Sequence, residues 1–183
     1  GGGRYRAPIF EPHLWNPMNA IRPATLLPFS DLDLQHRSLR LPDPSRVAAL
    51  TKSLRRHGQL TPLLVNVRAD GTMVLVDGFK RLTALESLGQ HEAVVRWLHL
   101  DEPQETATIV TSNRAHRGMT QLEEGWVIQW LVRTRKMTQE QVGTLLGRHK
   151  SWVCRRLKLA EALVEPVRED VLLGLVSATM GRE

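Results

Sequence analysis

The sequence of 183 residues contains one cysteine, Cys154, and only one tyrosine and three phenylalanines. A single cysteine cannot form an internal disulfide and has no cysteine partner for a metal site, which excludes a disulfide-stapled secreted domain. No apolar run approaches the roughly 18 residues of a membrane span, and the N-terminal part lacks a signal-peptide core. We expect a soluble cytoplasmic protein without a membrane partner, in which Cys154 is a small buried helix residue.

Positive charge prevails, with 25 Lys and Arg against 19 Asp and Glu, a formal net charge of +6 and an isoelectric point near 10.2. The surplus favours a polyanionic partner such as nucleic acid, although a solvated basic face would give the same total. The distribution is more informative than the total. Five cations crowd into one short stretch: Arg148, Lys150, Arg155, Arg156 and Lys158.

Residues 4 to about 30 contain five prolines and three arginines without a periodic apolar pattern. Proline fixes φ and lacks an N–H group, so this stretch predicts an extended arm, which we assign to residues 1–26. The arm is either a solvated linker or a segment that orders against a partner. The three leading glycines, without an initiator methionine, are expected to be an added or trimmed start.

Residues 27–117 alternate between helical and strand patterns, which predicts a small α/β unit. Apolar residues at helical spacing, such as Val47, Leu50 and Leu54, alternate with short β-branched runs and a turn at Asp70-Gly71. The expected helices cover residues 46–57, 80–88 and 102–110, and the expected strands cover 63–67, 73–76 and 94–98.

Residues 118–183 show helical spacing only, starting with a capping box from Thr120 to Glu123. We therefore expect an α+β protein in which an all-α domain follows the α/β unit. Within it, residues 138–159 predict a helix-turn-helix: Thr138 caps the first helix, Gly143 leaves room for a steep helix crossing, and Gly147 ends the helix.

The second helix of this pair is basic, which suits it to bases and phosphates in the major groove of double-stranded DNA. We expect His149, Lys150, Ser151 and Trp152 to read the bases. An ordinary helical hairpin with a charged face is the alternative, and Trp152 alone is more typical of a core. The full set of expected DNA-binding residues is Thr138, Gln139, Arg148, His149, Lys150, Ser151, Trp152, Arg155 and Arg156.

Three segments of the α/β unit place glycine, amide or cationic groups at a turn or a helix start: residues 58–62, 77–84 and 112–117. Gly78 at a strand-to-helix junction permits close backbone approach, and free N–H groups at the helix start favour an anion. Lys80 and Arg81 add charge there. A phosphate-bearing ligand fits this pattern, although the two cations are equally typical of a solvated helix face.

The order of these segments, followed by the helix-turn-helix, resembles the ParB family of partition proteins. Residues 46–65 resemble its first helix and Gly-x-x-x-Pro turn, residues 76–84 its Gly-Glu-Arg-Arg segment, and residues 122–124 the start of the following helix. The resemblance implies a homodimer that recognises a palindromic DNA site, binds CTP with magnesium and closes into a DNA clamp. It also implies a nucleoid-associated protein, with a ParA-type ATPase as a partner for the arm.

By position, the resemblance assigns Gly58, Thr61 and Pro62 to the border of the cytidine, and Asn113 to the third nucleotide motif and the magnesium. The residues it assigns to the nucleotide are Gly58, Thr61, Pro62, Gly78, Phe79, Lys80, Arg81, Ala84, Asn113, Arg114 and Arg117.

Three departures from the family pattern concern the chemistry of this site. Phe79 and Ser112 stand where the family has glutamates, and His116 stands where it has an arginine, with Arg117 one position late. Because carboxylates place metals and water, their loss disfavours hydrolysis but leaves nucleotide binding intact, and a weak CTPase activity stays an open alternative. The variant resembles ParB-like proteins of plasmids and other mobile elements more than chromosomal partition factors.

Two other functions share parts of this pattern. The first is an enzyme, because the α/β unit also resembles sulfiredoxin, a free-serine kinase and nuclease-like proteins. Sulfiredoxin needs a catalytic cysteine, but the only cysteine, Cys154, lies in the expected DNA reader. A kinase needs an acidic catalytic group near the phosphate loop, and Asp77 is the only obvious candidate there. A transcriptional regulator without a nucleotide is the second alternative.

Overall fold

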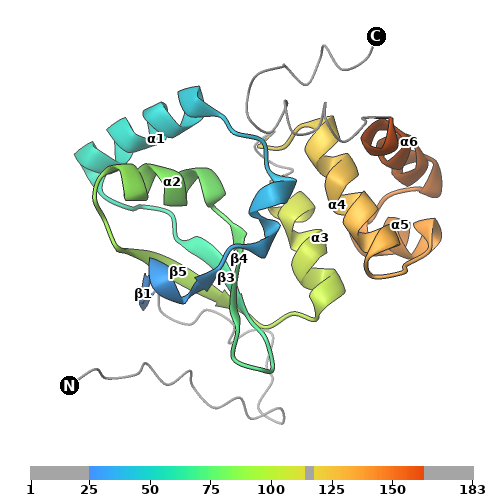
Figure 1. The fold of residues 1–183 in the computed structure, drawn as a ribbon, viewed down its shortest axis with the longest axis horizontal. Coiled ribbons are helices and arrows are strands. Elements are labelled where there is room, and N and C mark those ends of the chain that lie inside the picture. The colour runs from blue at the N-terminus through green and yellow to red at the C-terminus, as the bar shows by residue number, and fades with distance from the viewer. Residues whose placement is uncertain (1–24, 114–117, 163–183) are drawn as a thin grey trace.

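The computed structural model describes residues 25–113 and 118–162, which form an α+β fold (Figure 1). Its mixed five-stranded sheet has the strand order β1-β5-β3-β4-β2. Strand β1 pairs antiparallel to β5 and β3 antiparallel to β4, whereas β3–β5 and β2–β4 are parallel pairs. The strands are β1 (Thr25–Pro28), β2 (Leu32–Asp33), β3 (Leu63–Val67), β4 (Met73–Asp77) and β5 (Glu92–Leu98). The predicted α+β class is confirmed.

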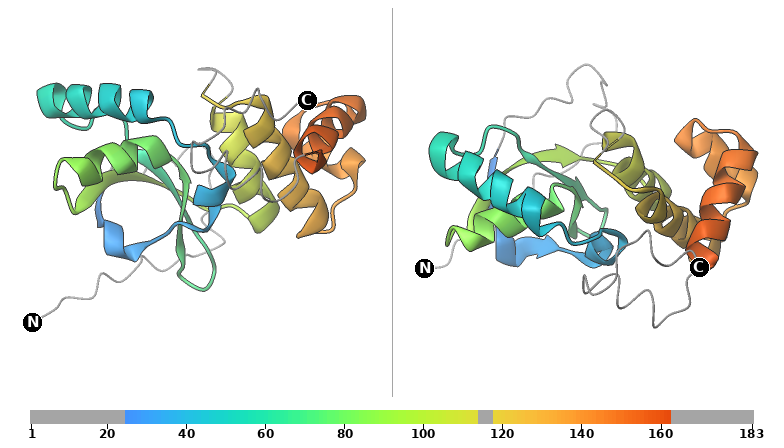
Figure 2. Two further views of the ribbon diagram at one scale, coloured as in Figure 1. Left: turned by 45° about the horizontal axis from the view of Figure 1, so that its top comes forward. Right: turned by 90° about the horizontal axis from the view of Figure 1, so that it is seen from above.

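Helices cover both faces of this sheet (Figures 1 and 2). Helices α1 (Pro44–His57) and α2 (Phe79–Ser87) lie on one face, and α3 (Glu102–Ser112) lies on the other. Helices α4 (Gln121–Arg133), α5 (Gln139–Leu146) and α6 (Lys150–Glu161) pack together beyond α3. The short 3-10 helix η4 (Gln35–Leu39) precedes α1 and contacts α4.

Alternation along the central strands builds two apolar clusters. In β4, Leu75 points into the cluster beneath α1 and α2, while the next residue, Val76, points into the cluster that contains α3. This second cluster continues through Trp126 of α4 to Val153 of α6. The α/β unit and the helical unit therefore share one apolar core through α3.

The periodicity located the α-helices and central strands of the described region to within two or three residues, but not the 3-10 helices at residues 29–31 and 35–39. Helix α1 begins at Pro44, two residues early, because the Asp43 side chain accepts a hydrogen bond from the Arg46 N–H and proline suits the first helical turn. Strands β1 and β2 were not predicted, and β1 includes the last two residues assigned to the arm. Cys154 is half-buried, so the prediction of a buried cysteine is wrong.

No helix among residues 25–113 and 118–162 is long and apolar enough to cross a membrane.

Candidate functional site

The junction between β4 and α2 is formed by Gly78, which has φ of +106°. This left-handed conformation favours glycine, and a Cβ here would lie 2.5 Å from Leu63 Cδ2, so the Leu63 side chain would have to shift. No side chain caps α2, and its first N–H groups stay available at the pocket described below. The predicted glycine at a strand-to-helix junction is therefore followed by an uncapped helix start.

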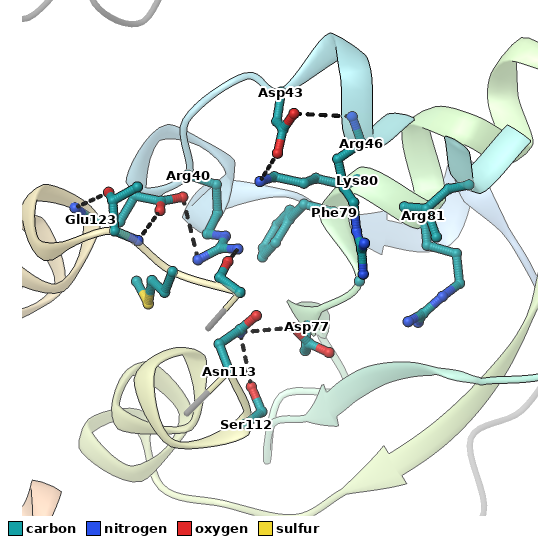
Figure 3. A pocket seen from close by; sticks show the side chains of 15 residues that line it. Arg40, Asp43, Arg46, Asp77, Phe79, Lys80, Arg81, Ser112, Asn113 and Glu123 are labelled. Carbon is teal, nitrogen blue, oxygen red and sulfur yellow. Dashed lines mark hydrogen bonds and ion pairs between the residues drawn. The ribbon is translucent and has the colours of Figure 1, made fainter. Parts of the chain in front are cut away.

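A pocket of about 390 Å³ opens at this helix start, where the beginnings of α1, α2 and α4 meet the end of α3 (Figure 3). Segments far apart in the sequence build its walls. They contribute Arg40, Asp43, Arg46, Leu50, Asp77, Gly78, Phe79, Lys80, Arg81, Ser112, Asn113, Gly118, Met119, Thr120 and Glu123.

Four cations line this pocket, and the structure holds three of them in place. Lys80 Nζ lies 3.0 Å from Asp43 Oδ2, Arg81 Nη1 donates to the Pro62 carbonyl at 3.1 Å, and Arg40 Nη2 donates to the Gly118 carbonyl at 2.7 Å. The fourth, Arg46, is exposed, and its guanidinium makes no hydrogen bond or ion pair with the described residues. Figure 3 shows this side chain reaching into the pocket between Phe79 and Arg81.

The charges at the pocket perturb one another. Burial lowers the pKa of Arg81; the Asp77 carboxylate opposes this effect, while the nearby Arg46 cation lowers the pKa further. At the rim, the Arg46 N–H holds the pKa of Asp43 at about 2, with help from Lys80 and Ser45 and against its partial burial. Two close cations beside free helix N–H groups favour an anionic ligand that would relieve their repulsion.

The other acidic and amide groups of the pocket come from the ends of β4 and α3 and from the start of α4. Asn113 Nδ2 donates to Asp77 Oδ1 at 3.0 Å and also bonds the Ile109 carbonyl and Ser112 Oγ. Glu123 is buried, and it accepts from the Leu41 and Thr120 N–H groups at 2.9 and 2.6 Å and pairs with Arg40 Nη1 at 3.3 Å. The start of α4 is thereby bonded to the segment that leads into α1.

The structure brings together five of the predicted nucleotide residues at this pocket: Gly78, Phe79, Lys80, Arg81 and Asn113. Gly58 and Thr61 lie in an exposed turn outside the lining, and Pro62 contributes only the carbonyl that holds Arg81. Ala84 is fully buried, so it can only shape α2 from within the core. Arg114 and Arg117 lie outside the described residues.

Sequence reasoning missed Arg40 and Arg46 as pocket residues. Both belong to the stretch around the start of α1, which joins the pocket only when that helix folds over α2. The Asp43-Pro44 pair was the available signal, because it marks a helix start and places Arg46 in the first turn.

Helices α5 and α6 form a pair joined by a tight turn, within the residues for which a helix-turn-helix was predicted. Thr138 and Gln141 form a capping box, and Gly147 ends α5 in the left-handed conformation. A Cβ on Gly143 would lie 2.7 Å from the Arg148 carbonyl, so the small residue is required by the tight turn, as predicted. Val153 and Leu157 of α6 are buried in the core.

The outer face of this helix pair carries most of the predicted DNA-binding residues. Thr138, Arg148, His149, Lys150, Ser151 and Arg155 are exposed, and Gln139 is half-buried. His149 caps α6 and its Nδ1 lies 2.9 Å from Ser151 Oγ, so these two side chains are fixed to each other. Lys150 Nζ lies 2.6 Å from Glu140 Oε1 at the surface, a pair that water and salt can separate.

Trp152 and Arg156 are placed differently from their exposed neighbours. The half-buried Trp152 ring has the guanidiniums of Arg148 and Arg156 each 5.3 Å from its centre. Arg156 Nε also donates to Glu124 Oε2 at 2.7 Å, which bonds α6 to the first turn of α4. These residues therefore hold α6 in place as well as bordering the exposed face of the α5–α6 pair.

Among residues 25–113 and 118–162, no three His, Cys, Asp or Glu side chains gather into a metal site. A divalent cation at the pocket would need oxygen ligands from a bound ligand as well as from the protein.

A family model described as ParB N-terminal domain matches residues 17–114, more than half of the chain. The chain belongs to the ParB family. A nucleoid occlusion protein of Shouchella clausii (strain KSM-K16) is 30% identical to it over 131 residues, which cover 71% of this chain and 45% of that protein. The ParB chain described here spans about half the length of the curated relatives it matches.

Among solved structures, a Pnob8-like ParB-N domain is similar with a TM-score of 0.50 and 18% identity, covering 86% of this chain and 71% of that one. A C-terminally truncated ParB from Caulobacter crescentus complexed with CTP-gamma-S is similar with a TM-score of 0.46 and 23% identity, covering 88% of this chain and 91% of that one. The Pnob8-like domain supports the fold assignment.

Proposed function

We propose that this ParB-family chain binds a specific double-stranded DNA site through α5 and α6, and that CTP bound in the pocket controls how the chain binds DNA. The observation that carries this proposal is the pocket itself, where four cations and an uncapped helix start face the first turn of α4. A nucleotide in this pocket would contact the helical unit as well as the α/β unit.

The phosphates of the nucleotide would lie at the N-terminus of α2. Helix N–H groups and the partial positive charge there attract phosphate oxygens. Arg46 is the cation best able to bind them, because it is exposed and has no other partner among the described residues. Lys80 and Arg81 would add charge from fixed positions.

DNA would contact the exposed face at the start of α6. Residues near the start of a recognition helix reach base edges, while cations along it fix the phosphates. The start of α6 carries His149, Lys150 and Ser151. Arg148 and Arg155 flank these residues with exposed guanidiniums. A homodimer would present two such helices to the two halves of a palindromic site.

The nucleotide would influence DNA binding through the first turn of α4. Glu123 lines the pocket and bonds the segment before α1, and its neighbour Glu124 bonds Arg156 of the recognition helix. A ligand that favours one position of this turn would shift the position of α6. We propose that the arrangement stabilised by CTP is the clamp state that the family resemblance implies.

We do not include hydrolysis in the proposed function. Phe79 and Ser112 both line the pocket at the positions where the family pattern has glutamates, and neither can activate a water. Residues 1–24 of the arm lie outside the described residues, and the interaction of the arm with a ParA-type ATPase stays a prediction.

The test uses the full chain with and without CTP, and with and without DNA selected from a random library. We expect CTP with magnesium to raise the melting temperature, and CTP together with the selected DNA to raise the crosslinked dimer fraction. If CTP changes neither quantity, the chain is a transcriptional regulator without a nucleotide switch, the second function that its helix-turn-helix supports.

A further inference from the structure

We infer that Asp77 is the carboxylate that holds a divalent cation on the phosphates of the bound nucleotide, with Asn113 as its positioning residue. This inference rests on the proposed nucleotide binding. It assigns the cation to a residue outside the two glutamate positions of the family pattern, which Phe79 and Ser112 occupy in this chain.

Three carboxylates line the pocket, and two of them already have several partners. Asp43 accepts from the Arg46 N–H and Ser45 Oγ and pairs with Lys80. Glu123 accepts from the Leu41 and Thr120 N–H groups and pairs with Arg40. Binding a cation at either carboxylate would break the bonds that start α1 or α4.

Asp77 has a free oxygen. Its Oδ1 accepts from Asn113 Nδ2 at 3.0 Å, and Oδ2 makes no hydrogen bond or ion pair with the described residues. The residue ends β4 immediately before Gly78, so its carboxylate lies beside the helix start where the phosphates are placed. Figure 3 shows Asp77 and Asn113 on the side of the pocket opposite Lys80.

One carboxylate is sufficient for this role when the ligand is a nucleoside triphosphate. Magnesium keeps several waters and is bound in such sites by one or two carboxylates plus phosphate oxygens. Without the cation, Asp77 would repel the phosphates, so the same residue makes nucleotide affinity depend on the metal. The bond from Asn113 fixes the carboxylate in the way that outer partners orient metal ligands.

The experiment measures CTP affinity by titration calorimetry in magnesium buffer and in EDTA, for the full chain and two variants. Asp77→Asn removes the charge but keeps an oxygen that can accept from Asn113. Asp31→Asn makes the same charge change at an exposed position of the 3-10 helix η3 (Phe29–Asp31), outside the pocket. Asp77→Ala replaces Asp77→Asn if thermal unfolding shows that the latter does not fold.

We expect magnesium to tighten CTP binding about tenfold or more in the wild type and in Asp31→Asn, because a lost cation contact costs at least that factor. In Asp77→Asn, affinity in EDTA should equal or exceed that of the wild type, and magnesium should add little. A purely structural Asp77 would instead lower affinity in both buffers.

Two outcomes overturn the cation site while leaving CTP binding intact: a wild type indifferent to magnesium, or an Asp77→Asn variant with full magnesium dependence. A wild type that binds no CTP in either buffer overturns the proposed nucleotide function and the cation site together.

Discussion

Nε of Arg156 lies 2.7 Å from Oε2 of Glu124, so helix α6 is bonded to the first turn of α4. Both side chains are less than one-fifth exposed, at 18% and 19%. Glu124 directly follows Glu123, which lines the pocket and is bonded to the segment before α1. The pocket and helix α6, which we propose reads DNA, are thus connected through one helical turn.

Arg156→Gln should lower stability, whereas its exposed neighbour Arg155→Gln should not. Removing a partner from a half-buried pair lies between the surface and the buried cases, so we expect a loss of about 1–2 kcal/mol. Urea unfolding of both variants measures it. Equal stability of the two variants would show that the Arg156–Glu124 bond contributes nothing.

Gly143→Ala should disrupt the turn between α5 and α6, because the new Cβ would lie 2.7 Å from the Arg148 carbonyl. Overpacking of this kind costs about 1–3 kcal/mol, and the displaced turn should also weaken DNA binding. Thr144→Ala, an exposed substitution in the next position, is the matched control for thermal unfolding. A Gly143→Ala chain as stable as this control would contradict the tight turn.

Lys150→Ala combined with Arg155→Ala should abolish site-specific DNA binding while CTP binding stays measurable. Both side chains are exposed on α6 and neither lines the pocket. If they contact phosphates, the slope of log affinity against log salt should fall by about two for the residual binding. Fluorescence anisotropy and calorimetry measure the two affinities, and joint loss of both would show that the sites are not separable.

The sequence was sufficient for elements whose pattern is local. Helical spacing located α1 to α6, and the cap and the glycines located the tight turn between α5 and α6. Strand β1 was missed because Thr25-Leu26-Leu27-Pro28 does not alternate and ends in proline; its pairing depends on β5, far along the chain. Strand β2 has only two residues and no pattern to detect.

Part of the site could also be predicted from residues that are close together in the sequence. Gly78, Lys80 and Arg81 were predicted because a strand end, a glycine and two cations follow one another. Arg40 and Arg46 join them only through the packing of α1 over α2, which no spacing rule gives. Trp152 had a local pattern that fitted two roles, and its contact with two guanidiniums is a property of the folded helix pair.

The buried carboxylate of Glu105 joins three segments of the α/β unit and gives a prediction for pH. It bonds His36 of η4 at 2.9 Å, Asn66 of β3 at 2.7 Å and Arg68 at 2.7 Å. Burial alone would raise the pKa of Glu105, but these hydrogen bonds outweigh it and lower the pKa from 4.5 to about 2.

A carboxyl with a lowered pKa stabilises the folded state above its unfolded pKa, and this stability is lost as pH falls from 4.5 to about 2. The shift corresponds to about 3 kcal/mol. Urea unfolding of the wild type and Glu105→Gln between pH 7 and pH 2 should therefore show two curves that converge over this window. Parallel curves would contradict the lowered pKa.

The central claim is that the pocket binds CTP, and Arg46 offers the most direct test of it. Arg46→Ala removes an exposed side chain without a partner among the described residues, so the fold should be unaffected. The measurement is the melting temperature of both chains with and without CTP and magnesium. At a hundredfold excess over its dissociation constant a ligand adds about 2.7 kcal/mol, which is several degrees for a chain of this size. We predict that CTP raises the melting temperature of the wild type by this amount and that of Arg46→Ala much less; no rise in the wild type, or an equal rise in both, would contradict the claim.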